Sequence, residues 1–166
     1  LLPQPEASAS VTVQVVGHWP GMAREAAEIL GRMARHLQAL EVSGVMDEQC
    51  TASLFSTVGR AARLQRLCLT NCRGVSAALL GGAVSLPTGL HHLDLSVNEL
   101  APQAVEGLAA ALPRLPHLEH LSLNRCGLGD RGGLVVMRAL PAGLRELGAA
   151  QNGMGWKALQ GMSASV

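Results

Sequence analysis

The stretch LHHLDLSVN, residues 90–98, decides the fold, because its spacing LxxLxLxxN returns along the chain. The same pattern, ending in Cys instead of Asn, occurs at 64–72 and 118–126. Weaker copies begin at 37 and 144, so the copies start at positions 37, 64, 90, 118 and 144. Self-similarity at a period of roughly 20–50 residues is the signature of stacked repeats. The sequence therefore predicts a repeat solenoid.

The second half of each unit repeats as well. After Asn98, apolar or small residues recur every fourth position, which indicates one face of a helix, at Leu100, Ala104, Leu108 and Leu112. A proline follows the last of these positions in three units, where a helix should stop: Pro87, Pro113 and Pro141. Each unit is therefore predicted to be a short strand followed by a helix.

The pattern extends in weaker form to the start of the chain. One period before position 37 lies a degenerate first repeat, 10–36, with a strand expected over 11–16 and a helix over 22–37. We expect residues 1–166 to form a single domain of five to six such repeats, and to be a fragment of a longer array. The predicted fold class is an α/β horseshoe-shaped solenoid, with parallel strands on its concave face and helices on its convex face.

These units resemble leucine-rich repeats of the ribonuclease-inhibitor type, with Asn and Cys alternating at the ninth position. The strand string 93–98 and the helical string 102–112 look like the C-terminal arrays of NOD-like receptors, most of all the MHC class I transactivator branch. This resemblance implies a role in innate immunity or transcription regulation. The ATPase of that family uses a GxxxxGK(S/T) loop, and the sequence contains no such string.

The amino-acid composition argues against some classes of binding partner. The 166 residues carry a formal charge of +1, so no nucleic-acid or anionic-membrane footprint is evident. No basic apolar leader or membrane-spanning run is present. We expect a cytoplasmic protein, with the nucleus as a further location, and no cofactor.

The four cysteines are expected to be reduced thiols. Cys72 and Cys126 occupy the ninth repeat position, where a short side chain can bond backbone groups of the turn. Cys50 is expected to be a buried residue of the second helix. Cys68 falls between two inward leucines, so it is the thiol expected on the exposed strand face.

The concave face is built from the outward strand positions and is the expected surface for a protein partner. Interface hot spots favour Trp, Tyr and Arg, and Arg66 alone among these positions is of that kind. The candidate contacts are Glu41, Arg66, Cys68, Thr70, His92, Asp94, Ser96, His120, Ser122, Asn124 and Glu146.

His92 and His120 hold equivalent positions in adjacent units, with Asp94 nearby, and two His with a carboxylate are the minimum ligand set for zinc. Such a flat, open face encloses an ion poorly, so we expect no metal site. No GxSxG elbow or paired carboxylates occur, and we expect no catalytic residues.

The ends of the stack lack a polar capping unit. We therefore expect an exposed end face that contacts neighbouring repeats or a second copy, formed by Met154, Trp156 and Leu159, with Leu147 and Met162 also partly exposed. The sequence predicts a non-enzymatic recognition or scaffolding module, the sensing and autoregulatory repeat region of a NOD-like receptor. The alternative is a free-standing inhibitor that blocks an enzyme with its concave face.

Overall fold

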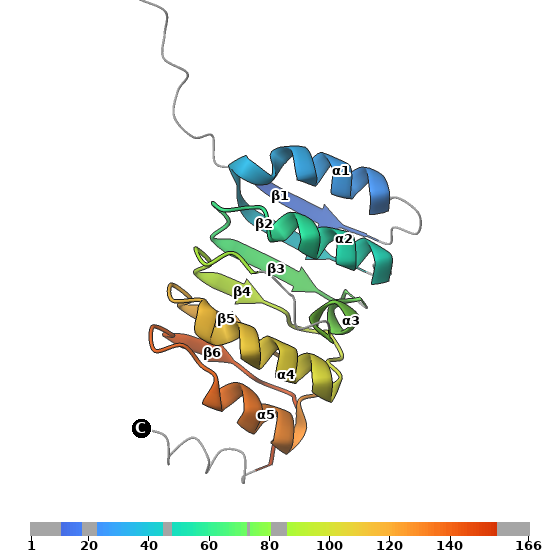
Figure 1. The fold of residues 1–166 in the computed structure, drawn as a ribbon. Coiled ribbons are helices and arrows are strands. Elements are labelled where there is room, and N and C mark those ends of the chain that lie inside the picture. The colour runs from blue at the N-terminus through green and yellow to red at the C-terminus, as the bar shows by residue number, and fades with distance from the viewer. Residues whose placement is uncertain (1–10, 18–22, 45–47, 73, 81–85, 156–166) are drawn as a thin grey trace, which may run out of the picture.

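A computed structural model describes residues 11–17, 23–44, 48–72, 74–80 and 86–155. Within these ranges six parallel strands form one open sheet, and each strand pairs with the next one along the chain (Figure 1). Each unit therefore adds its strand beside that of the preceding unit, as the repeat pattern predicts. The strands are β1 (Val11–Val16), β2 (Leu37–Ser43), β3 (Arg66–Thr70), β4 (His92–Asp94), β5 (His120–Ser122) and β6 (Glu146–Gly148).

The helices form a second row along one side of this sheet (Figure 1). Each α-helix contacts the next one in chain order. They are α1 (Ala23–Met33), α2 (Glu48–Val58), α3 (Val75–Leu80), α4 (Pro102–Ala111) and α5 (Gly129–Arg138), with short 3-10 helices η1 (Ala34–His36) and η2 (Leu112–Arg114).

Leucines stacked across the strands make the core between the two rows. The fourth position of each pattern aligns from unit to unit, in the order Leu40, Leu67, Leu93, Leu121 and Leu147. The first four are at most 1% exposed. Full burial of each such side chain contributes about 1.5–3 kcal/mol, so this repeated position is one of the main sources of stability between neighbouring units.

The ninth position bonds adjacent units through buried polar groups. Asn98 Oδ1 accepts the backbone N–H of Cys72 at 2.7 Å, and Asn98 Nδ2 donates to the carbonyl oxygens of Leu69 and Leu95. Asn152 makes the same bonds two periods later, to the N–H of Cys126 and the carbonyls of Leu123 and Ala149.

The two cysteines of this position donate hydrogen bonds in their turn. Cys126 Sγ lies 3.2 Å from the carbonyl oxygen of Leu95, and Cys72 Sγ lies 3.4 Å from that of Thr70. Burial raises the pKa of the Cys72 thiol to about 11, so the thiol keeps the proton that it donates. The predicted structural role of both cysteines is confirmed.

A left-handed residue ends each strand segment. It has positive φ in all six units, at Gly17, Gly44, Asn71, Val97, Arg125 and Gln151. The N–H of Gly44 donates to Thr70 O, and that of Val97 donates to Asn124 O, so the turn continues the ladder into the next unit. At Gly44 a Cβ atom would collide with the carbonyl oxygen of Gly17, so this position needs glycine.

The first helix is shorter than the sequence predicts. The expected helix over 22–37 is observed as α1 followed by η1, and Leu37 is the first residue of β2. Leu37 is fully buried and pairs with Val11, so sheet pairing and burial end the helical segment before it. The expected strand over 11–16 is confirmed as β1. Among the described residues, no helix is long and apolar enough to cross a membrane.

Candidate functional site: the open face of the sheet

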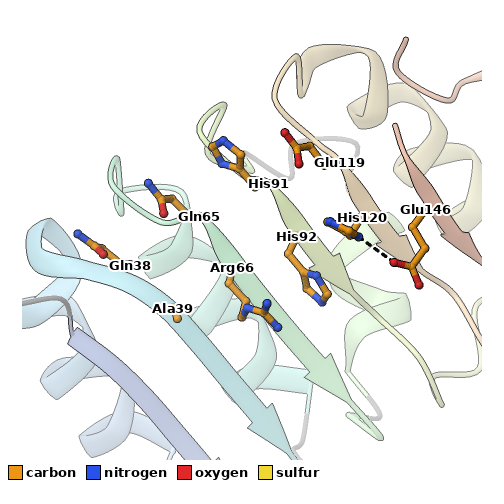
Figure 2. A pocket seen from close by; sticks show the side chains of 9 residues that line it. All are labelled: Gln38, Ala39, Gln65, Arg66, His91, His92, Glu119, His120 and Glu146. Atoms are coloured by element: carbon orange, nitrogen blue, oxygen red, sulfur yellow. Dashed lines mark hydrogen bonds and ion pairs between the residues drawn. The ribbon is translucent and has the colours of Figure 1, made fainter. Parts of the chain in front are cut away.

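The face of the sheet turned away from the helices carries the outward strand residues in rows, and we call it the open face. Strand pairing aligns Arg66, His92, His120 and Glu146 as one row. Figure 2 shows these four side chains on successive strands. A second row lies two residues further along the strands and contains Glu41, Cys68, Asp94 and Ser122. The sequence therefore predicts correctly which outward residues lie next to one another on neighbouring strands.

The first row is ordered by charge. His120 Nδ1 lies 2.9 Å from Glu146 Oε2, and the dashed line in Figure 2 marks this pair. The His92 and His120 rings lie side by side with centroids 5.7 Å apart. Burial lowers the pKa of His92, and the positive charge of Arg66 lowers it further. His92 is therefore mainly an uncharged imidazole at neutral pH, with the Arg66 cation on one side and the hydrogen-bonded His120–Glu146 pair on the other.

The second row contains the thiol that the sequence assigns to the exposed face. Cys68 is half-buried, and burial raises the pKa of its thiol to about 11, with Asp94 and Glu41 adding to the shift. The reactive thiolate is therefore scarce at neutral pH. Asp94 Oδ1 accepts the backbone N–H of Ser96 at 2.8 Å, which orients the carboxylate.

Ser96 and Asn124 lie at equivalent positions two residues beyond the second row, and both are bonded to Ser122 of that row. The hydroxyls of Ser96 and Ser122 lie 2.9 Å apart, and Asn124 Nδ2 donates to Ser122 Oγ. Ser96 is 7% exposed, so the expectation that it offers an exposed contact is wrong. Its hydroxyl also accepts the N–H of Asn124, and this role within the sheet removes it from the surface. Ser122 and Asn124 stay partly exposed, as does Thr70.

Residues just before the strands extend the open face at one rim. The rings of His91 and His117 stack with their centroids 5.8 Å apart. Arg145 Nη1 lies 3.6 Å from Glu119 Oε2 and forms an ion pair with it. His91 and Glu119, together with the first row, border a shallow pocket of about 570 Å³ (Figure 2), lined by Gln38, Ala39, Gln65, Arg66, His91, His92, Glu119, His120 and Glu146.

Sequence reasoning missed the part of this pocket formed by Gln38, Gln65, His91 and Glu119. These four residues share one repeat position, and each directly precedes the outward residue of its own strand that lies in line with the first row. The recurring polar identity at that position was the available signal.

The side chains of Cys68, His92 and Asp94 lie close enough on the open face to bind one metal ion jointly. Single ligand atoms of Cys68, His92 and Asp94 lie within 4.8 Å of one another. This set has Cys68 in place of His120, which the sequence had suggested together with His92 and Asp94, and His120 contacts Glu146.

The expected end face lies mostly outside the described residues, since Trp156, Leu159 and Met162 belong to 156–166. Met154 and Leu147 are described, and both are partly exposed. Leu147 is partly exposed because no described strand covers the outer edge of β6, whereas its equivalents are covered on both sides.

Comparison with known proteins agrees with this architecture. A family model described as Leucine Rich repeat matches residues 114–137, which run from the end of η2 through most of α5. The fold is a leucine-rich repeat solenoid. The solenoid is similar to NACHT, LRR and PYD domains-containing protein 12 of Homo sapiens, at 35% identity over 143 residues. The match covers 81% of this chain and 13% of that protein, so the chain spans a small part of the relative's length.

Proposed function

We propose that the chain is part of the repeat array of a NOD-like receptor and that its open face binds a protein partner without catalysing a reaction. The similarity to a NACHT, LRR and PYD domains-containing protein supports the receptor class. Within that class, the strings 93–98 and 102–112 favour the MHC class I transactivator branch. The proposal includes a cytoplasmic location, and for that branch a nuclear one.

The observation that carries the binding proposal is the first row of the open face. Its four residues run from the cation Arg66 through His92 to the His120–Glu146 pair, on rigid neighbouring strands. Such a charge gradient favours a partner surface with acidic groups facing Arg66 and basic groups facing Glu146. The leucines build the stack, whereas these side chains project away from it and are free to vary with the partner.

A triple variant, R66A/H120A/E146A, tests this role. All three side chains belong to the first row, and none of them lies in the buried core. A control variant, Q103A/E106A/R131A, removes exposed side chains of α4 and α5 instead. The purified chain and both variants are used as bait, and captured proteins are compared quantitatively after thermal unfolding shows that all three are folded.

The proposal predicts at least one protein that the unaltered chain and the helix-side control both capture and that the open-face variant loses by about tenfold or more. Equal capture by all three baits would contradict it. Loss with the helix-side control alone would assign binding to the helices. The free-standing inhibitor is less well supported, because Arg66 is the one Trp, Tyr or Arg side chain among the described outward strand positions.

A further inference from the structure

We propose that Cys68, His92 and Asp94 form a binding site for a zinc-class divalent cation on the open face. The thiol sulfur, one imidazole nitrogen and one carboxylate oxygen lie within 4.8 Å of one another. Cys68 and Asp94 are direct partners across β3 and β4, and His92 lies two residues before Asp94 on the same face of β4. The sheet therefore holds the three Cα atoms in place before any ion binds.

The donor set matches the chemistry of zinc. Zn²⁺ binds thiolate, imidazole and carboxylate together, and hard cations such as Mg²⁺ do not select sulfur. Tetrahedral bonds of about 2.0–2.3 Å place ligand atoms about 3.5 Å apart. Ligand atoms at the 4.8 Å limit have to approach one another by about 1.3 Å to reach this spacing, and we expect side-chain rotation to supply that movement.

The surroundings of the three ligands support an ion as well. Asp94 Oδ1 accepts the N–H of Ser96, which orients the carboxylate as an outer-shell partner does in metal sites. Glu41 pairs with Cys68 across β2 and β3 and adds negative charge to the same row. His120 lies beside His92 but is held by Glu146. The fourth position of the ion is therefore open to water or to a side chain of a bound partner.

Arg66 opposes the ion and supplies a variant that should bind more tightly. Its guanidinium lies close enough to Cys68 to interact with the thiol. A positive charge next to a cation site weakens binding by Coulomb repulsion. We expect Arg66→Gln to raise the affinity several-fold. Loss of a ligand should have the opposite effect, so the site is tested in both directions.

Titration of the full chain with Co²⁺ in a non-chelating phosphine reductant tests the site directly. Cobalt reports on its ligands, because a bound thiolate produces a sulfur-to-metal charge-transfer band that histidine and carboxylate do not. The variants are Cys68→Ser, His92→Gln, Asp94→Asn and Arg66→Gln. The matched control is His117→Gln, an exposed ring at the rim, away from the three ligands. Displacement of Co²⁺ by Zn²⁺ measures the zinc affinity.

We expect one equivalent of Co²⁺ to bind with the charge-transfer band, which Cys68→Ser abolishes. His92→Gln and Asp94→Asn should each weaken binding by at least about tenfold, and His117→Gln should leave it unchanged. Binding without the band, or with equal affinity in the Asp94→Asn variant, would overturn the proposal and indicate adventitious binding to surface histidines. Failure of Co²⁺ to bind at all would overturn it too. The protein-capture test uses none of these three ligands, so the two proposals can fail separately.

Discussion

Val97 adopts a left-handed backbone conformation, with φ of 62°, that valine rarely takes. Its side chain is 43% exposed, so little packing offsets this cost. A non-glycine residue in this region costs about 1–2 kcal/mol, and asparagine tolerates the region because its side chain bonds locally. The equivalent residue of the preceding unit is Asn71.

We therefore expect Val97→Asn to raise the free energy of unfolding by about 1 kcal/mol. Urea denaturation followed by circular dichroism measures this change. Val97→Ala is the control, because alanine removes the apolar surface and keeps the Cβ atom that clashes in this conformation. An equal gain in both variants would show that backbone strain is not the cause.

The hydrogen bonds of Asn98 allow the cost of replacing this residue to be estimated as a free energy of unfolding. Replacement by alanine leaves the N–H of Cys72 and the carbonyl oxygens of Leu69 and Leu95 without their side-chain partner in a buried site. We expect Asn98→Ala to lower the free energy of unfolding by roughly 2–4 kcal/mol. Asn124→Ala, whose bonds lie nearer the surface, should cost less than about 1 kcal/mol. Denaturation curves of the two variants give the two free energies of unfolding, and a similar loss in both variants would contradict the prediction.

The roles of Asn98 and Val97 differ in how far the sequence could predict them. The ninth position could be assigned from spacing alone, because Asn and Cys alternate there and a turn must satisfy its backbone groups. The positive φ of Val97 could not, since valine is atypical of such turns. The stack imposes that conformation on every unit, whatever residue occupies the position.

At the level of elements, the contact between α3 and α4 depends on a glycine. A Cβ atom at Gly107 would collide with the carbonyl oxygen of Leu79 in α3. Gly132 in α5 has ordinary van der Waals space, with its nearest neighbours on Leu128 and Val105. These two helical glycines therefore differ in what they permit.

Glycine to alanine inside a helix gains about 0.5–1 kcal/mol when nothing obstructs the methyl group. We expect this gain, or a neutral effect, for Gly132→Ala. For Gly107→Ala we expect a loss of roughly 1–3 kcal/mol, because α3 and α4 must move apart. Thermal unfolding of the two variants provides the comparison. A gain at both positions would mean that the helices can separate freely.

On the scale of the whole molecule, stability is expected to be shared unevenly along the stack. In a solenoid each unit contacts its neighbours, so an inner unit is supported on two sides and an edge unit on one. Leu93 lies between Leu67 and Leu121 and is fully buried. Leu147 holds the same repeat position at the last described strand and is partly exposed.

Leu93→Ala is expected to cost about 2–5 kcal/mol, and Leu147→Ala about 1 kcal/mol. The measurement is chemical denaturation together with amide hydrogen exchange, which should show faster exchange in β6 than in β4. Equal costs for the two variants would show that the outer edge of β6 is covered in solution. That result would support contact with further repeats or a second copy.

The repeat, the order of strands and helices, and the alternation of inward and outward strand positions all follow from the amino-acid sequence alone. They do so because the period of 26–28 residues and the alternation of side chains along a strand are local properties. Tertiary structure decided the rest: the burial of Ser96, the His120–Glu146 pair and the closeness of Cys68 to His92 and Asp94. Each of these depends on how side chains from neighbouring units turn toward one another. Spacing along the chain fixes their row but not their partner.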